Sequence, residues 1–390
     1  MVREIAIYIY LKLFSFLFKL AKFFPIQKKI VFCVSFIENN YFIYNELKSL
    51  SQSYPCIFLT DHKTNSFFKE RITTGDKVVL FSPKHLVSFF IGIYHLATAK
   101  VVVLDNYFGF LSAVQFNNDV KKLQIWHANG AIKTFGWKDY SIKYRTSGAK
   151  ERFAAVYDQF DFILSGSKKM SKIYGEAFSL PQNRMIEVGI PRTDIFFDQT
   201  YIEKVKNNFY TNYPILKNKQ VILYAPTFRD NKEETSELPL NISYLKEYLE
   251  SDYILIIKLH PSINNAIDLT NYEGFIYDFS DYPTMNDLLF ITDILITDYS
   301  SIPFEYSFLH KPMIFYPYDL KEYSQTRGFW EPYEQLVPGP IAYNTEEIVH
   351  FIKESIFDER QIETFHKEWN TYSLGNASKN VANLLINWLK

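Results

Sequence analysis

Short apolar runs alternate with amphipathic stretches along most of the chain after Pro25. Runs of this length, separated by helical patterns such as the one around Lys168–Phe178, are typical of parallel strands buried on both faces. The first series predicts strands at Ile30–Phe36, Cys56–Leu59, Val78–Phe81, Val101–Leu104, Leu123–Trp126, Phe162–Leu164 and Met185–Val188. The second series predicts strands at Val221–Tyr224, Tyr253–Leu259, Ile294–Thr297 and Pro312–Phe315.

A polar stretch at about 196–218 separates the two series. The pattern therefore predicts an α/β protein with two doubly wound Rossmann-like domains that face each other across a cleft. We expect the domains at 26–200 and 201–390, after an N-terminal helix at 1–25. The last helical segment, about 361–390, is a candidate to pack back across the domains.

The N-terminal segment is apolar and carries a narrow polar strip. Its longest uncharged stretch is about seven residues, well below the roughly 18 needed to span a bilayer. No small-residue cleavage site follows, which weakens a signal-peptide interpretation. On a helical wheel, one arc of roughly 80° holds Glu4, Lys12, Ser15, Lys19 and Lys22. This favours an amphipathic membrane-association helix with its lysines toward anionic lipid. The alternative is a helix packed on the domain with a narrow solvated strip.

Charge and cysteine content exclude several classes. The 42 Lys and Arg residues nearly balance 43 Asp and Glu, which argues against a general nucleic-acid binder. Two cysteines, Cys33 and Cys56, cannot form a disulfide framework or a four-cysteine zinc site, and they fit a reducing cytoplasm. The sequence has no Gly-x-Gly, GxxxxGK[ST], HExxH, Gly-x-Ser-x-Gly or Asp-x-Asp motif. We therefore expect no metal and no cofactor.

Polar residues follow four of the predicted strands, and ligands bind at the carboxyl ends of the strands in open parallel sheets. These residues come from both halves of the chain: His127 and Asn129, Thr227 and Arg229, His260, and Asp298 with Ser300 and Ser301. A histidine with a near-neutral pKa is suited to removing a proton from an alcohol. A lone histidine after a strand is more often structural. Two histidines at the carboxyl ends of strands, one from each half of the chain, together favour a catalytic role.

The stretch after the strand at Ile294–Thr297 is a candidate anion site. Ser300 or Ser301 is a good N-cap, and a proline at 303 fits the first turn of a helix. A helix N-terminus attracts anions, so two hydroxyls beside it are suited to a diphosphate. Glu305 lies one turn further, within reach of a ribose hydroxyl. The alternative is an ordinary capped helix without a ligand. Arg327, in "SQTRGFW", offers a planar fork for phosphate.

Six motifs in this order carry a family resemblance: "WHANGAIKTFG", "GIPRTDIFF", "YAPTFRD", "KLHPS", "TDYSSIPFEY" and "RGF". As a set they resemble the CDP-glycerol glycerophosphotransferases of teichoic acid synthesis, over about 28–345. The short length and the "WHA" form are more similar to the primase branch than to the long polymerases. The resemblance implies a GT-B-like fold whose C-terminal domain mainly holds the donor nucleotide. It implies transfer of glycerol phosphate from CDP-glycerol to an acceptor hydroxyl, with release of CMP.

The resemblance also assigns roles to residues. His127 corresponds to the proposed base, and His260 to a histidine near the donor phosphates. Ser300 and Ser301 would cradle the diphosphate. The other expected donor-binding residues are Glu305 at the ribose, Arg327 at phosphate, Thr227 and Arg229. Asp298, Lys133 and Asn129 are expected to position these groups without touching the donor. Asp298 is placed among them because its charge would repel a diphosphate.

An in-line attack on the β-phosphorus needs a base on the acceptor side and cations or dipoles on the CMP side. His127 and the serine-capped helix, expected on opposite domains, suit these roles. The acceptor implied by the resemblance is a lipid-linked saccharide or polymer. We then expect a peripheral, monotopic enzyme at the cytoplasmic face of an anionic membrane, without nucleic acid as a partner.

Two alternatives stay open at this stage. One is a transferase of the same fold that uses CDP-ribitol or a nucleotide sugar in capsule synthesis. The other is a non-catalytic, membrane-associated binding module whose histidines are structural.

Overall fold

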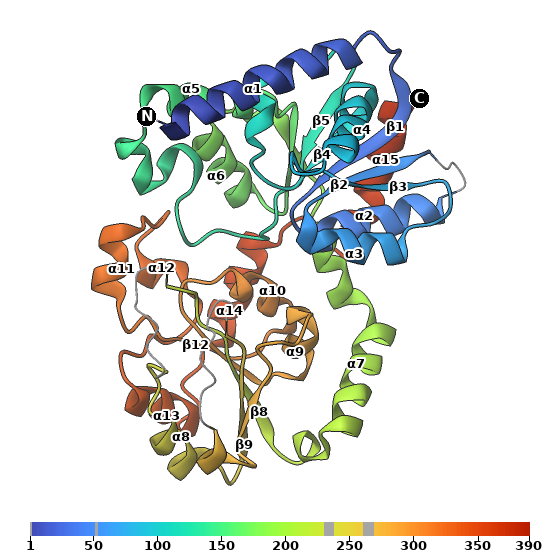
Figure 1. Cartoon of the computed structure of the whole chain (residues 1–390). Helices are drawn as coiled ribbons and strands as arrows, with labels where there is room; N and C mark the ends of the chain where they lie inside the picture. The colour runs from blue at the N-terminus through green and yellow to red at the C-terminus, as the bar shows by residue number, and fades with distance from the viewer. Residues whose placement is uncertain (1, 51–53, 230–237, 260–268) are drawn as a thin grey trace. The chain divides into compact units, whose positions relative to one another are not determined.

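The computed structural model describes residues 2–50, 54–229, 238–259 and 269–390. Contacts divide the chain into two units, drawn in Figure 1. The first unit consists of Met1–Ala128, Phe135–Asp194 and Thr371–Lys390. The second consists of Asn129–Thr134 and Ile195–Asn370.

The first unit is built on a parallel sheet of seven strands in the order β3-β2-β1-β4-β5-β6-β7. The strands are β1 (Gln27–Val34), β2 (Cys56–Thr60), β3 (Lys77–Leu80), β4 (Ala99–Leu104), β5 (Lys121–Gln124), β6 (Phe162–Ser165) and β7 (Met185–Glu187). Its α-helices are α1 (Val2–Ala21), α2 (Glu38–Ser49), α3 (His62–Arg71), α4 (Leu86–Ala97), α5 (Ser147–Tyr157), α6 (Lys168–Phe178) and α15 (Ala377–Leu389). The strand order reverses direction between β1 and β4, the point where doubly wound sheets bind their ligands.

The second unit has a five-stranded parallel sheet in the order β10-β9-β8-β11-β12. The strands are β8 (Gln220–Tyr224), β9 (Tyr253–Ile257), β10 (Ile276–Asp278), β11 (Ile294–Thr297) and β12 (Met313–Phe315). The helices are α7 (Gln199–Asn212), α8 (Ile242–Leu249), α9 (Met285–Ile291), α10 (Ile302–Tyr306), α11 (Leu320–Thr326), α12 (Tyr333–Leu336), α13 (Thr345–Lys353) and α14 (Glu359–Trp369). Here the order reverses between β8 and β11.

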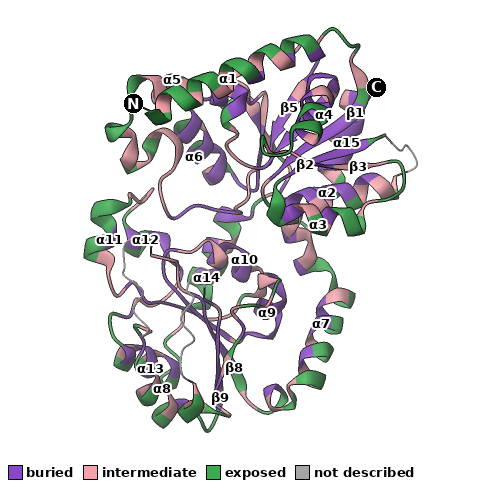
Figure 2. Cartoon of the chain, in the orientation of Figure 1, coloured by how far each residue is buried: buried purple, intermediate pink, exposed green. Residues whose placement is uncertain are grey.

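Each sheet has the burial expected of parallel strands covered on both faces. The central strands are buried almost along their whole length, as Figure 2 shows in purple. In the first unit, the rings of Phe32 on β1 and Phe58 on β2 stack 4.8 Å apart. All the strands expected from the sequence are present, with ends shifted by a few residues. The short strand β10 was not predicted.

The boundary between the units falls at Asp194–Ile195, a few residues before the expected one, and two further segments differ from the expected domains. Residues 371–390 belong to the first unit, because α15 packs on α2 and on strands β1 and β4. Val381, Leu385 and Leu389 of this helix are buried in the same apolar core as β1. Asn129–Thr134 belong to the second unit, since Thr134 N donates to the carbonyl of Gly328 at 2.9 Å.

Helix α1 packs on the first unit through one narrow face. Phe14 and Phe18 are both 1% exposed, and they pack against Phe110 and Phe116 at ring distances of 5.1 Å. The opposite face is open and apolar, with exposed Val2, Ile5, Ile9, Leu13, Phe16 and Leu20. The packed-helix alternative expected only a narrow solvated strip on the exposed side of this helix. The exposed side is instead broad and apolar. No described helix combines the length and apolarity that crossing a bilayer requires.

Candidate active site

His127 lies just beyond the carboxyl end of β5. The ladder to β4 continues for one residue, where Ile125 N donates to the carbonyl of Leu104 at 2.7 Å. Trp126 then takes a left-handed conformation with φ of 52°. Such a backbone is uncommon for a bulky side chain and clusters at functional sites. The turn ends the strand and places His127 at the carboxyl edge of the first sheet.

The imidazole of His127 is held between two aromatic rings. The Phe36 ring stacks on it at 4.2 Å, and the Trp126 ring at 4.5 Å. Its Nδ1 atom lies 3.1 Å from the backbone carbonyl oxygen of Asp105. A carbonyl oxygen only accepts hydrogen bonds, so Nδ1 carries the proton and the lone pair is on Nε2. Burial lowers the pKa of His127, and the charge of Arg192 adds to this, which favours the neutral base.

The Asp105 carboxylate holds the neighbouring strand end in place. It accepts hydrogen bonds from the backbone N–H groups of Ser35 and Phe36 and from the Asn40 amide, each at 2.8 Å. Burial raises the pKa of Asp105 to about 7, although these hydrogen bonds oppose the shift. Asp105 thus supports His127 twice: its carbonyl binds the ring, and its carboxylate fixes the segment that carries Phe36.

Two further side chains fix the backbone around His127. Arg192 Nη1 donates to the carbonyl of His127 at 2.9 Å. The Asn39 amide donates to the carbonyl of Trp126 at 3.1 Å and accepts from Arg192 N at 3.0 Å. The peptide groups on both sides of the Cα of His127 are therefore bound. A base held in this way needs little reorganisation before proton transfer.

In the second unit, an arginine joins the loops after β8, β11 and β12. Arg229 Nη2 donates to Asp298 at 2.8 Å, and its Nε donates to Asp319 at 2.7 Å. Thr227 N donates to the other Asp298 oxygen at 2.8 Å. Burial alone would lower the pKa of Arg229, but Asp319 and Asp298 together raise it. Arg229 and Asp298 therefore fix the carboxyl edge of this sheet at its switch point.

Aromatic rings enclose this ion pair. The Arg229 guanidinium carbon lies 4.9 Å from the ring centroids of both Tyr299 and Tyr323, and these two rings stack at 3.8 Å. The hydroxyl of Tyr333 donates to the Asp298 carbonyl at 2.8 Å. Cation–π contact and low solvent access strengthen such a pair. These contacts join the described parts of the loops where the sequence predicted a ligand.

The serines lie at the start of the short helix α10. Ser301 is the N-cap residue, but its side chain makes no capping bond. Instead, Ser300 Oγ accepts a hydrogen bond from Ile302 N at 3.2 Å. Both serines are half-buried, and Pro303 lies in the first turn as predicted. Glu305 is only 2% exposed, so it lies in the interior beside this turn.

The remaining candidates lie on neighbouring segments. Asn129 is fully buried, and its amide donates to Asn370 at 2.7 Å within the second unit. Lys133 pairs with Phe329 in an antiparallel bridge. Arg327 directly follows α11 and is exposed. His260 lies outside the described residues.

Sequence reasoning missed three residues of these surroundings: Phe36, Asp105 and Asp319. Asp105 directly follows β4, so the rule that identified His127 also applies to it. Asp319 carried no signal, since its role depends on Arg229, 90 residues earlier. Among the residues described, no group of three or more His, Cys, Asp or Glu side chains is placed to hold a metal ion.

Comparison with known proteins gives a consistent assignment. The family described as CDP-Glycerol:Poly(glycerophosphate) glycerophosphotransferase matches residues 16–387. The teichoic acid glycerol-phosphate primase of Bacillus subtilis is 36% identical over 363 residues, which cover 93% of this chain and 92% of the relative. The teichoic acid ribitol-phosphate primase of Bacillus spizizenii is 35% identical over 80% of this chain and 82% of its own length.

The fold is similar to that of a solved relative. The structure of the wall teichoic acid polymerase TagF superimposes with a TM-score of 0.79 at 24% identity, over 98% of this chain and 95% of that chain. UDP-GlcNAc 2-epimerase from Neisseria meningitidis gives a TM-score of 0.60 at 16% identity, over 92% and 99% of the two chains. The fold is GT-B-like, with two parallel sheets and their helices.

Proposed function

The chain belongs to the CDP-glycerol:poly(glycerophosphate) glycerophosphotransferase family, and from this premise we propose that it transfers glycerol phosphate from CDP-glycerol to an acceptor hydroxyl. CMP is the other product. The acceptor is a hydroxyl group of a lipid-linked saccharide or of a growing teichoic acid or capsule-type polymer. The observation that carries the proposal is the imidazole of His127, held at the carboxyl edge of the first sheet by the Asp105 carbonyl, with a pKa that burial lowers.

In this reaction the acceptor oxygen attacks the β-phosphorus of CDP-glycerol. A bond forms between these two atoms, and the bond from the β-phosphorus to the bridging oxygen breaks, so CMP leaves with that oxygen. His127 Nε2 takes the proton of the attacking hydroxyl. A base with a near-neutral pKa contributes about 10²–10⁴-fold to such a step. The Asp105 carbonyl stabilises the imidazolium that forms, since Nδ1–H still donates to it.

The second unit supplies the donor side of the proposal. Ser300 and Ser301 bind the diphosphate at the start of α10, and Arg327 adds a cation. Thr227 is a further candidate, because its Oγ1 is buried and has no hydrogen-bond partner among the residues described. Arg229 acts by fixing the loop that carries Thr227.

Glu305 as the ribose ligand and His260 at the donor phosphates complete the proposed donor site. Asp298, Lys133 and Asn129 support it from behind. Asp298 holds Thr227 N and Arg229. Asn129 and Lys133 fix the segment that passes into the second unit.

We also propose that the enzyme works as a peripheral protein at the cytoplasmic face of a membrane that holds its acceptor. The open apolar face of α1 supports this, because such a face is stable in the headgroup layer and costly in water. The helix would keep the enzyme near a lipid-linked substrate.

CDP-ribitol is the second candidate donor. It is favoured by the relative named a ribitol-phosphate primase, which is nearly as similar to this chain as the glycerol-phosphate primase. CMP release by the purified protein, offered each CDP-polyol with and without a membrane-lipid extract, tests the proposal. Acceptor-dependent release from CDP-glycerol supports it. Release from CDP-ribitol or a nucleotide sugar alone would overturn the donor, and no release from any of them would overturn the reaction.

A further inference from the structure

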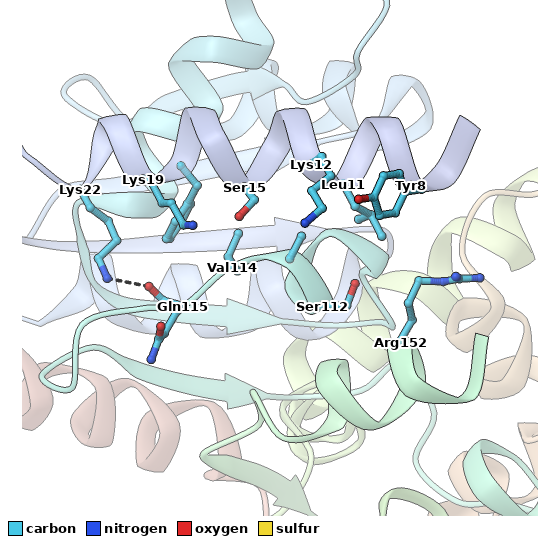
Figure 3. A pocket seen from close by; sticks show the side chains of 12 residues that line it. Tyr8, Leu11, Lys12, Ser15, Lys19, Lys22, Ser112, Val114, Gln115 and Arg152 are labelled. Carbon is cyan, nitrogen blue, oxygen red and sulfur yellow. Dashed lines mark hydrogen bonds between the residues drawn. The ribbon is translucent and has the colours of Figure 1, made fainter. Parts of the chain in front are cut away.

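A pocket of about 490 Å³ lies between α1 and the segment that follows β4 (Figure 3). Its volume is in the range of small-molecule sites. One wall is the polar flank of α1, and the other is 112–115 with Arg152 of α5. The lining residues are Tyr8, Leu11, Lys12, Ser15, Phe18, Lys19, Lys22, Ser112, Ala113, Val114, Gln115 and Arg152. Four of them are cationic and none is acidic.

The pocket is a built feature, since aromatic contacts fix its two walls. The Phe14 ring stacks on Phe110, which lies in the 3-10 helix η1 (Gly109–Ala113). Phe18 packs edge-on against Phe116, just beyond the wall. Both phenylalanines of α1 are buried. These contacts therefore fix the positions from which the lysines of α1 extend along the pocket.

Two of the cations have partners and two lack a carboxylate. Lys22 Nζ donates to the carbonyl of Gln115 at 2.7 Å, and Arg152 pairs with Glu4 at 3.0 Å. Within the described part of the chain, Lys12 and Lys19 make no ion pair. Both are exposed at the pocket, so their positive charge is available to an anion.

The same helix presents its apolar face beside these lysines. Ile5, Ile9, Leu13, Phe16 and Leu20 recur every three or four residues and are 47–59% exposed. At 100° per residue, Lys12 and Lys19 lie about 70° from the centre of this stripe. Cations at the edge of an apolar stripe match the boundary between acyl chains and headgroups.

Helix α4 enlarges the apolar surface. It packs against α1, with Phe89 5.8 Å from the Phe14 ring. Its own outward residues Leu86, Val87, Phe90 and Ile91 are 43–75% exposed. Two packed helices thus carry exposed apolar side chains, a feature that marks interaction sites such as membrane surfaces.

We propose that this pocket binds the phosphate-bearing headgroup of an anionic membrane lipid, while the apolar faces of α1 and α4 lie among the acyl chains. The inference deepens the proposed membrane association and names its ligand. Free phosphate would satisfy the lysines and leave the apolar surface in water. A lipid would bind the lysines through its phosphate and cover the apolar surface with its acyl chains, so we assign the site to a lipid.

The test is co-sedimentation of the purified full-length protein with vesicles. One set contains phosphatidylcholine alone, and the other also contains phosphatidylglycerol. Each lysine near an anionic surface contributes about 1 kcal/mol, so Lys12→Gln with Lys19→Gln should weaken binding to the anionic vesicles about 30-fold. The matched control, Lys63→Gln with Lys69→Gln on α3, removes the same charge from another exposed helix and should bind like wild type.

A pocket must also be distinguished from diffuse attraction. Ser15→Trp places bulk in the pocket without a change in charge, and it should weaken binding to anionic vesicles while binding to phosphatidylcholine is unchanged. Wild-type binding of Ser15→Trp, with circular dichroism showing a native fold, would overturn the headgroup site. Equal loss for the α3 control would overturn it too. Full competition by inorganic phosphate would assign the site to free phosphate instead.

The catalytic proposal is tested separately with a detergent-solubilised acceptor extract. We expect the Lys12, Lys19 and Ser15 variants to release CMP at the wild-type rate there. Loss of vesicle binding with this activity intact supports the headgroup site. Absence of CMP release in the wild type would overturn the proposed reaction and leave the vesicle result unaffected.

Discussion

The Nδ1 atom of His127 lies 3.1 Å from the backbone carbonyl oxygen of Asp105. This contact fixes the tautomer that leaves Nε2 free to accept a proton. The atom that accepts this hydrogen bond is a main-chain oxygen at the end of β4. The position of that strand in the sheet therefore sets the orientation of the imidazole. The Asp105 carboxylate then ties the same strand end to β1 and α2.

The acid limb of the pH profile should reflect this environment. Burial lowers the pKa of His127 below its ordinary value of about 6.5. A lowered pKa keeps the base unprotonated to a lower pH, so activity stays level as pH falls to 6.5 and is lost below that. The measurement is kcat/KM for CDP-glycerol against pH. An acid limb with its midpoint above 6.5 would contradict the assignment.

Replacement of Asp105 should destabilise the first unit. Asp105→Ala leaves the N–H groups of Ser35 and Phe36 and the Asn40 amide without their acceptor. Unsatisfied buried donors of this kind cost about 1–3 kcal/mol each, and we expect a total loss of about 3 kcal/mol in urea unfolding. Asp119→Ala, at an exposed position, is the control and should change stability by less than about 0.5 kcal/mol. Equal losses would show that Asp105 is not a structural anchor.

Two glycines separate backbone strain from steric clash. Gly136 and Gly274 both have positive φ, 62° and 80°, so alanine strains the backbone at either position, by about 1–2 kcal/mol. Of these two positions, only Gly136 would bring the added Cβ into a clash, with the carbonyl oxygen of Ala177. Gly136→Ala should therefore lower the melting temperature clearly more than Gly274→Ala. The reverse order would contradict the close packing of this loop on α6.

Loss of the Arg229 cation should destabilise the second unit. Arg229→Met leaves Asp298 and Asp319 buried without a counter-charge, which costs about 3–5 kcal/mol. Urea unfolding measures this loss, with exposed Arg360→Met as control, which should change stability by less than about 0.5 kcal/mol. Equal losses for the two variants would contradict the ion-pair account.

Local sequence pattern was sufficient for some features and insufficient for others. Strands appeared as apolar runs, and the rule for carboxyl ends led to His127, Thr227 and Asp298. The residues next to a side chain in the sequence do not show which distant segment it will contact in the fold. Asp319 as partner of Arg229 therefore had no signal. The last helical segment was expected to pack back across the domains, but its pattern did not show that α15 joins the core of the first unit.

The N-terminal helix shows the same limit. Its polar arc was visible in the sequence, and the interfacial interpretation followed from it. The pocket was not visible, because it exists only where α1 packs over 112–115 through Phe14 and Phe18. Likewise, the motif that contains His127 gave no sign that its residues 129–134 pack with the second unit.

The role of His127 as the base is tested most directly by the rate of acceptor-dependent CMP release from CDP-glycerol by His127→Ala, measured beside wild type and the exposed-histidine control His62→Ala. We expect a kcat about 10²–10⁴-fold lower for His127→Ala, as is usual for loss of a general base. We also expect unchanged CDP-glycerol binding, a native circular dichroism spectrum, and wild-type activity for the control. Transfer by His127→Ala at the wild-type rate would contradict the account and remove His127 from the mechanism.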